Sequence, residues 1–488
     1  MDGQSKRASG SGPKWRKAAG IGSLMLLCLW TSGCRYTAAP ADLLQQPSIA
    51  SDKQQLVQAV EAALPAYGKL AIPLRGDETE AIRLVDYDRD GIDEAIASYY
   101  NEFNAPEMML FEREDEEWRM KAVIEQPLAR QLDWLDIEDL DGDGAVEMFV
   151  GWIGNGSFDS PSLLEVYRFG QNPVMNEEGQ TVLKPVESMP YVYADAGDVN
   201  GDGQKELAVV TAGVGVDSGD GRSLKADYRL SLYKWSEGAL AEMQSLPLSP
   251  DVNTYERVLI GRISERKSGI VVEASAGAHS SVTELYAWEN GKLRRVPLEE
   301  QDQGMSWTPV RNRDIDGDGI IELAVVAEPP GNSGLPYAET LWITEWKRWD
   351  GKDGYVRVRE EYSDYAYGFR FVVPDDWSGR YTLSRPAKDE GYAVVQFDYW
   401  NGESGSRAEL ATVYVVPQKD WEGYQAGRKE AGGRPLSVLE TGGGLVYAVS
   451  LKEEAPEGLA AADREAYLAM LMTQEEAKRQ LTLIRDDE

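Results

Sequence analysis

Four acidic loops of one pattern recur along this 488-residue chain, and each runs into a short apolar segment. The loops are DYDRDGIDE from Asp86, DLDGDGAVE from Asp139, DVNGDGQKE from Asp198 and DIDGDGIIE from Asp314. Each has an oxygen-bearing side chain at its first, third and fifth positions, glycine at its sixth and glutamate at its ninth. Alternate carboxylates in a tight loop can converge on one hard cation, for which Ca2+ is the natural candidate.

The residues after each loop exclude an EF-hand. An EF-hand loop has a bidentate glutamate at its twelfth position and a helix on either side. The twelfth positions here are Ala97, Val150, Val209 and Val325, within apolar runs typical of buried strands. Asp-Gly turns also favour tight bends without any ion, and a single loop would leave that alternative open. Four copies in one carboxylate register favour Ca2+.

The oxygen-bearing residues of the loops are the predicted ligands, one Ca2+ per loop and about four sites in all. They are Asp86, Asp88, Asp90 and Glu94; Asp139, Asp141, Asp143 and Glu147; Asp198, Asn200, Asp202 and Glu206; and Asp314, Asp316, Asp318 and Glu322. The formal charge of the chain is −33, so bound cations would relieve repulsion within it. The same charge repels nucleic acid, which we do not expect as a partner.

Each loop belongs to a longer repeat. The interval between the third and fourth loops is about twice the other intervals, which predicts a degenerate copy near residue 260. GRISERKSGIVVEA from Gly261 aligns without a gap on GDVNGDGQKELAVV from Gly197 and has Arg262 where the first ligand is expected. Alternating hairpin patterns follow, for example around Trp235 and Trp288. A repeat therefore holds about four strands, the content of a propeller blade.

This repeat is similar to the FG-GAP/VCBS family, whose repeats also build the β-propeller of integrin α subunits. The likeness covers residues 66–362 and is carried by the D-x-[DN]-x-D-G-x-x-[DE] loop, with glutamate where the family more often has aspartate. It implies a mainly β, Ca2+-binding propeller used for adhesion or ligand recognition rather than a particular reaction. Five repeats are recognisable; six or seven blades, with a divergent blade built from residues 43–85, are the alternative.

The N-terminus has the pattern of an export signal. A basic region precedes the apolar run AAGIGSLMLLCLW from Ala18, which is too short for a comfortable membrane span. Its end, TSGC, resembles a bacterial lipoprotein lipobox, although Thr31 stands where leucine is usual. The likeness implies cleavage before Cys34, diacylglyceryl attachment to its thiol, palmitate in the anchor, and location on the outer face of the cell membrane. An ordinary signal peptide and an uncleaved anchor are the alternatives.

The predicted organisation is a lipoprotein signal peptide (1–33), a tether (34–50), a helix (51–65), the propeller (66–362) and a C-terminal α+β domain (363–488). Leu459 to Ile484 has the pattern of a helix, with acidic and basic residues at helical spacing. The last domain also resembles small domains with a GF-x-F-x-P-x-x-W opening that end several Gram-positive lipoproteins, which implies no chemistry.

Catalytic motifs are scarce. The one histidine is His279, and the chain has no GxSxG or HExxH motif. We therefore expect a protein that is not an enzyme: a membrane-anchored lipoprotein whose extracellular propeller binds a protein or a glycan. Its working surface would be the polar connections at the far end of the loop strands, which start at Tyr100, Gly154, Gly213, Ser275 and Glu328. Solvated hairpin ends are the alternative reading of these connections.

Two other functions are kept. The first is an extracytoplasmic carbohydrate-active enzyme that uses acids of the loop face such as Asp159, Asp217 and Asp220, because paired carboxylates suit glycoside chemistry. The second is a purely structural component of the cell envelope. Neither the ligand nor the partner follows from the sequence.

Overall fold

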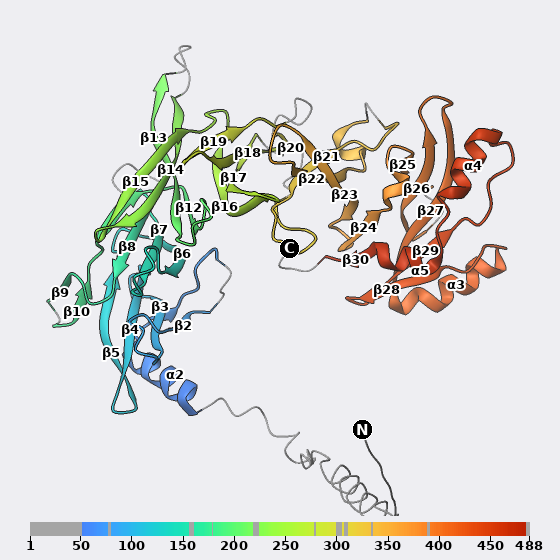
Figure 1. The fold of residues 1–488 in the computed structure, drawn as a ribbon. Coiled ribbons are helices and arrows are strands. Elements are labelled where there is room, and N and C mark those ends of the chain that lie inside the picture. The colour runs from blue at the N-terminus through green and yellow to red at the C-terminus, as the bar shows by residue number, and fades with distance from the viewer. Residues whose placement is uncertain are drawn as a thin grey trace, which may run out of the picture. The chain divides into compact units, whose positions relative to one another are not determined.

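The computed structural model describes most of the chain from residue 51 onward (Figure 1). The described ranges are 51–76, 80–155, 161–177, 179–217, 224–277, 280–298, 305–306, 311–332, 335–387 and 391–484. The chain divides into two compact units, Met1–Ala63 and Leu64–Glu488. The predicted signal peptide, Cys34 and the tether lie outside the described residues, as do His279, Asp159 and Asp220.

In the first unit the structure describes helix α2 (Ser51–Ala63), at the place of the helix predicted for residues 51–65. The helix ends two residues before Pro65, because the residue that precedes a proline disfavours helical backbone angles. Among the described residues no helix is long and apolar enough to cross a membrane.

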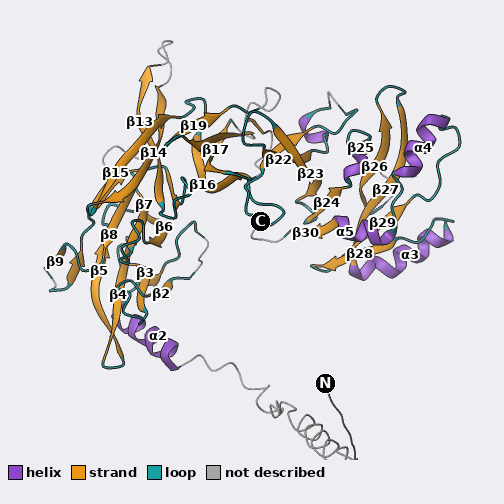
Figure 2. Ribbon diagram, in the orientation of Figure 1, coloured by secondary structure: helices purple, strands orange, loops and turns teal. Residues whose placement is uncertain are grey.

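The second unit consists of separate sheets, and five of them, which we call blades 1 to 5, follow the predicted repeats (Figures 1 and 2). The main strands are β2 (Ile82–Val85), β3 (Glu94–Tyr100), β4 (Pro106–Glu114) and β5 (Glu117–Glu125) in blade 1; β6 (Gln131–Glu138), β7 (Glu147–Ile153), β8 (Leu163–Arg168) and β11 (Glu187–Pro190) in blade 2; β12 (Tyr193–Gly197), β13 (Glu206–Asp217), β14 (Leu224–Ser236) and β15 (Ala239–Pro247) in blade 3; β16 (Thr254–Ser264), β17 (Lys267–Ala276), β18 (Ser280–Glu289) and β19 (Lys292–Val296) in blade 4; and β21 (Leu323–Ala327), β22 (Ile343–Trp349), β23 (Tyr355–Asp364) and β24 (Phe369–Val373) in blade 5.

Short strands extend these sheets. They are β1 (Lys69–Leu70), which pairs with β3, the hairpin β9 (Pro173–Met175) and β10 (Thr181–Leu183), which joins β5, and β20 (Met305–Ser306), which pairs with β18. Because β1 and β2 both pair with β3, the described part of residues 43–85 forms α2 and part of blade 1 rather than a blade of its own.

Each of the first three acidic loops connects the first strand of a blade to its second strand. In blade 5 a single bridge between Arg313 and Glu322 takes the place of the first strand. The second strand of a blade packs against a neighbouring blade on each of its two faces, so both faces are apolar. In β7 of blade 2, Met148 packs toward blade 1 and Phe149 packs toward blade 3. This position explains the continuous apolar runs after the loops. The predicted fold class, a mainly β propeller followed by an α+β domain, is confirmed.

Blade 4 contains the degenerate repeat. Strands β16 and β17 meet in a tight hairpin in which Ser264 pairs with Lys267, so no acidic loop separates them. Gly261 pairs with Gly269, whereas Gly197 of blade 3 pairs with Glu206, so the turn is one residue shorter than a gapless alignment implies. The predicted strands of this repeat are therefore present.

The last sheet contains β25 (Tyr381–Ser384), β26 (Ala393–Asn401), β27 (Ser406–Pro417), β28 (Ser437–Gly442) and β29 (Leu445–Leu451), beside helix α3 (Trp421–Glu430). The predicted boundary between residues 362 and 363 falls inside β23, because the alternating apolar residues of β24 add that strand to blade 5. The helix predicted over 459–484 is two helices, α4 (Ala461–Ala469) and α5 (Gln474–Gln480), because Thr473 and Glu476 form a capping box that begins a new helix. Strand β30 (Leu481–Leu483) then pairs with β24.

Candidate functional site

All four acidic loops have the same internal hydrogen bonds. In the loop at 314, Asp314 Oδ2 accepts the N–H of Gly319 (2.7 Å), Asp316 Oδ1 accepts that of Asp318 (3.2 Å), and Asp318 Oδ1 accepts that of Ile320 (2.9 Å). The equivalent three bonds are present in the other loops. Each of these side chains therefore commits one oxygen to the loop. Asp314 and Asp198 also use their other oxygen within the loop, where it accepts the N–H of Gly317 and of Gly201 respectively.

Two loop positions need a left-handed backbone. The sixth position has a φ of 80° at Gly319, as its glycine predicted, and the fourth position has a φ of 80° at Gly317. In the first loop the fourth position is Arg89, which adopts a φ of 60°. The predicted loop pattern gave the fourth position no role, although three of the four loops have glycine there.

The ninth-position glutamates are buried and close each loop. Glu322 Oε2 accepts the backbone N–H of the second loop residue, Ile315, at 3.0 Å, and the other three glutamates make the same bond. Burial, together with the neighbouring aspartates, raises the pKa of Glu94, Glu147 and Glu206 to about 7. The ninth residue thus holds the loop shut whether or not it also contacts an ion.

Carboxylate oxygens converge in three of the loops. They lie within 4.8 Å of one another in the groups Asp86, Asp88 and Asp90; Asp139, Asp141 and Glu147; and Asp314, Asp316 and Glu322. Oδ1 of Asp86 and Oδ1 of Asp139 are buried and have no hydrogen-bond partner among the described residues. A cation would satisfy these oxygens, so the residues fit a hard metal ion.

Some predicted ligands have other partners. Asp143 Oδ2 lies 2.7 Å from Arg168 Nη2, and Asp318 Oδ2 lies 2.7 Å from Arg348 Nη2. Asn200 donates from its side chain to Glu206. Glu94 is not among the three carboxylates that converge in its loop.

In two loops an arginine side chain contacts the ninth-position glutamate. These arginines were not predicted from the sequence. Arg168 pairs with Glu147 across the sheet and lies 3.1 Å from its carboxylate. Arg348 follows Lys347, the residue that pairs with Leu323, and lies 2.8 Å from the carboxylate of Glu322. The same register places Glu112 beside the first loop and Lys234 beside the third.

Loops of consecutive blades touch one another. Arg89 Nη2 of the first loop lies 2.6 Å from Asp139 Oδ2 of the second, and Gln204 Nε2 of the third donates to the backbone oxygen of Asp141. Arg262 of blade 4 donates to the backbone oxygen of Asp318 at 3.2 Å. The loops therefore lie along one edge of the blades. Of the polar connections predicted as the binding surface, the one after Tyr100 is described in full, and the others lie partly outside the described residues.

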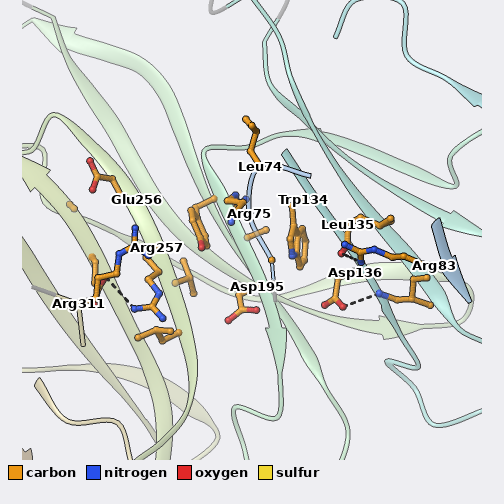
Figure 3. Close-up of a pocket in the computed structure, with 18 of the residues that line it drawn as sticks. Leu74, Arg75, Arg83, Trp134, Leu135, Asp136, Asp195, Glu256, Arg257 and Arg311 are labelled. Carbon is orange, nitrogen blue, oxygen red and sulfur yellow. Dashed lines mark hydrogen bonds and ion pairs between the residues drawn. The ribbon is translucent and has the colours of Figure 1, made fainter. Parts of the chain in front are cut away.

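A cleft of about 950 Å3, which we call the inner cleft, is lined by the first strands β2, β6, β12 and β16, by residues of β17 and β18, and by Arg311 and the segment Leu74–Gly76 (Figure 3). Its volume falls in the range of pockets that hold small ligands. The loops and the inner cleft are thus connected by the same first strands.

Equivalent positions of the repeats face the inner cleft. The third residue before each loop contributes Arg83, Asp136, Asp195 and Arg311, and blade 4 contributes Leu259. The fifth residue before the loop contributes Trp134, Tyr193 and Arg257. Because side chains of a strand alternate between its two faces, residues two apart point to the same side. The signal for these positions is present in the sequence, because it appears when the residues before the loops are aligned.

Asp136 and Asp195 are the two carboxylates of this set. Asp136 Oδ1 accepts the N–H of Ile137 at 2.9 Å, and Asp195 Oδ1 accepts that of Ala196 at 3.0 Å. Burial raises the pKa of Asp136 to about 6, with a contribution from Glu138. Burial raises the pKa of Asp195 to about 7, and the charge of Asp136 adds to the effect.

Arginines flank the two carboxylates. Arg75 Nε lies 2.8 Å from Asp133 Oδ2, and its guanidinium carbon lies 3.5 Å from the ring centroid of Tyr193. Arg257 Nη1 donates to the backbone oxygen of Asn312 at 3.0 Å. Arginine and acidic side chains are equal in number among the lining residues: Arg75, Arg83, Arg257 and Arg311, against Asp136, Asp195, Glu256 and Glu273. The inner cleft is therefore close to neutral in a strongly acidic chain.

Comparison with known families places an FG-GAP-like repeat at residues 139–209, which spans the loops at 139 and 198 and the first strand of blade 3. This match confirms the resemblance deduced from the loops. A comparison with curated proteins returned no match.

Solved structures with a similar arrangement include three enzymes. A rhamnogalacturonan lyase from Bacillus licheniformis is 12% identical, with 70% of this chain and 85% of the lyase covered and a TM-score of 0.28. A mannose phosphorylase from Leishmania mexicana is 8% identical over 66% and 85% of the two chains, with a TM-score of 0.23. A thermostable family-43 glycoside hydrolase is 10% identical over 64% and 95%, with a TM-score of 0.25.

We expected a chain that is not an enzyme, whereas the three similar structures are all enzymes, and that expectation is withdrawn. That expectation depended on missing histidine and serine motifs. Carboxylates alone can carry out glycoside chemistry, so the missing motifs do not exclude it.

Proposed function

We propose that this chain is an exported lipoprotein whose Ca2+-braced propeller binds a glycan in the inner cleft. The observation that carries the proposal is the alignment of Arg83, Asp136, Asp195 and Arg311 at one position of blades 1, 2, 3 and 5, all facing one cleft. Hydroxyl groups both donate and accept hydrogen bonds, so a sugar can satisfy carboxylates and guanidinium groups side by side. A ligand with only negative charge would be repelled by the carboxylates, and a ligand with only positive charge would be repelled by the guanidinium groups.

Aromatic surface supports the same class of ligand. Trp134 and Tyr193 line the inner cleft two residues before Asp136 and Asp195 on the same strands. Aromatic rings provide apolar surface for the C–H groups of sugars, and polar groups around them fix orientation. The ring of Tyr193 is held in place by Arg75, which is itself held by Asp133. A preformed site of this kind loses little entropy when the ligand binds.

Ca2+ bound in the acidic loops would hold the ends of the first strands, which line the inner cleft. The residues that would hold it are the loop carboxylates already described, and Asp136 and Asp195 each stand three residues before one of them. A bound ion stabilises a loop by neutralising its carboxylates and satisfying the buried oxygens of Asp86 and Asp139. Its role in this proposal is structural.

The lipid anchor is supported by the sequence around Cys34, and it would keep the propeller on the outer face of the cell membrane. Metabolic labelling with a palmitate analogue tests it. Label on the full chain and its loss in Cys34→Ala are the expected results. An unlabelled, freely secreted wild-type chain would contradict the anchor while leaving glycan binding untouched.

Glycan binding is tested with the full chain carrying Cys34→Ala, against a panel of neutral and acidic cell-wall and plant polysaccharides. Isothermal titration calorimetry should show binding to at least one of them. We expect Arg311→Gln to weaken binding by about tenfold, the size of one hydrogen bond to a charged group. Arg266→Gln is the matched control, because Arg266 is an exposed arginine in the β16–β17 turn. Equal loss in both variants would contradict a specific role for the inner cleft.

A further inference from the structure

We propose that the inner cleft also cleaves the glycan that it binds, with Asp195 as the proton donor and Asp136 as the base that activates water. This inference rests on the proposed function, since it needs a sugar in the inner cleft. The two residues lie at equivalent positions of β6 and β12, the first strands of consecutive blades, and both point into the cleft (Figure 3).

The fold of a blade does not require a carboxylate at this position. The equivalent residues are Arg83 in blade 1, Leu259 in blade 4 and Arg311 before the last loop, and these blades form the same sheets. A carboxylate that served only to shape the strand would be expected in every repeat. The pair is therefore a local feature of blades 2 and 3.

The pair is costly for stability. Each carboxylate accepts a hydrogen bond from the next backbone N–H, and the described residues show no other hydrogen bond to either side chain. Both side chains are partly buried, and the charge of Asp136 acts on Asp195. Partial burial of two interacting carboxylates costs free energy unless several donors surround each of them. Strained or destabilised groups of this kind gather at functional sites, where stability is exchanged for activity.

The charged neighbours of the two residues differ. The charge of Glu138 raises the pKa of Asp136, and the charges of Lys205 and Arg83 lower it. The charge of Asp136 raises the pKa of Asp195, and the charges of Arg75 and Arg257 lower it. Burial raises the pKa of both, and that of Asp195 lies higher. Two carboxyl groups whose environments separate their pKa values are suited to opposite proton-transfer roles. We assign the proton to Asp195, whose pKa is the higher of the two and is also raised by the charge of Asp136.

The reaction is the hydrolysis of a glycosidic bond. Asp195 gives its proton to the bridging oxygen as the bond between that oxygen and the anomeric carbon breaks. A water molecule forms the new bond to the anomeric carbon, and Asp136 takes the proton that this water loses. The products are two shorter sugars, one water is consumed, and both carboxyl groups regain their starting protonation by exchange with solvent.

The test uses the full chain with Cys34→Ala and the same polysaccharide panel. Binding is measured by calorimetry, and cleavage is measured as the appearance of new reducing ends. We expect Asp136→Asn and Asp195→Asn each to lower cleavage at least a hundredfold, while glycan affinity changes by less than about tenfold. Asp227→Asn, an exposed residue of β14, should leave both unchanged. The wild-type rate should show a bell-shaped pH profile that loses its alkaline limb in Asp195→Asn.

Each other outcome decides the matter. A wild-type chain that binds a polysaccharide but releases no reducing ends overturns cleavage and leaves the proposed function intact. Cleavage that survives both substitutions, or that yields unsaturated sugars by elimination, overturns the assigned roles. Failure to bind any polysaccharide of the panel overturns the proposed function and this inference with it.

Discussion

The guanidinium group of Arg348 lies against the buried carboxylate of Glu322, with Nη2 2.8 Å and Nε 3.0 Å from Oε1. The same Nη2 atom lies 3.2 Å from Asp316 Oδ2 and 2.7 Å from Asp318 Oδ2. One arginine therefore neutralises much of the acidic loop at 314 from within the protein. The four loops share one backbone geometry but differ in the side chain that faces them, so their cation affinities should differ.

Removing this arginine should strengthen cation binding at its loop. In Arg348→Gln, Asp316, Asp318 and Glu322 lose their positive partner and become available to Ca2+. We expect Ca2+ affinity at this loop to rise by about tenfold, because one partly exposed charge contact changes binding by roughly 1 kcal/mol or somewhat more. Calorimetric titration with Ca2+ measures it. Arg266→Gln is the control, and a titration identical to that of the wild type would show that Arg348 does not compete with the ion.

Removing Ca2+ should destabilise the propeller, and Asp86 should carry part of the effect. Chelation is expected to lower the melting temperature, because an ion at a hundred times its dissociation constant stabilises a fold by about 2.7 kcal/mol. The Oδ1 atom of Asp86 is buried and lacks a hydrogen-bond partner among the described residues. Asp86→Asn removes the negative charge of this side chain, so the variant should gain less stability from added Ca2+ than the wild type. Glu265→Gln, in the turn of blade 4 without an acidic loop, should gain as much as the wild type.

Thermal unfolding with and without chelator measures both effects. A melting temperature that does not respond to Ca2+ over a wide range would contradict cation binding by the loops. A full response in Asp86→Asn would contradict only the assignment of that oxygen.

The stability of the fold should depend on pH through Asp195. Its folded pKa of about 7 lies above the unfolded value of about 3.9, so the folded state binds this proton more tightly and stability falls as pH rises between those values. Asp195→Asn cannot ionise. We therefore expect the variant to be more stable than the wild type at pH 8 by roughly 1–3 kcal/mol, and to differ little at pH 4.

Urea unfolding at the two pH values measures this difference. Asp227→Asn, which changes an exposed aspartate of β14, should show no such dependence. An Asp195→Asn variant that is equally stabilised at both pH values would indicate a packing effect instead of the loss of a buried charge. The same measurement applies to Asp136→Asn, for which the window closes at about pH 6.

The loops made the fold predictable because local chemistry determines their geometry. Aspartates at alternate positions bond to loop N–H groups, so the turn, the strand that follows it and the blade it begins could be inferred without knowledge of distant contacts. The inner cleft could not be inferred in this way. It forms where first strands of different blades converge, and Arg83 or Asp195 has no local feature that marks it as a site residue.

The C-terminal boundary failed for a related reason. Strand β24 pairs with β23, its neighbour in sequence, and with β30, which is far away in sequence, and alternating apolar patterns give the strands but not their partners. The break between α4 and α5 depended on a capping box at Thr473 that the charge pattern of the segment concealed.

Gly151→Ala should displace residues that support the lining of the inner cleft. A Cβ atom at Gly151 would overlap the hydroxyl oxygen of Tyr191 and would lie 2.9 Å from its Cζ atom and 3.2 Å from the Cβ atom of Trp134. Tyr191 donates a hydrogen bond to Asp133, which also holds Arg75. The new methyl group would therefore displace a buried tyrosine and loosen the arginine beside Tyr193. We expect a loss of about 2–4 kcal/mol in the free energy of unfolding and weaker glycan binding.

Urea unfolding and calorimetry check these two effects. Gly427→Ala is the matched control, because Gly427 lies in helix α3 with open space around it and alanine there should stabilise the chain by about 0.5–1 kcal/mol. Tyr191→Phe added to Gly151→Ala removes the overlapping oxygen and should restore part of the lost stability, but not the bond to Asp133. A Gly151→Ala variant as stable as the wild type would mean that the first strands of blades 2 and 3 can shift without cost, which is incompatible with a preformed inner cleft.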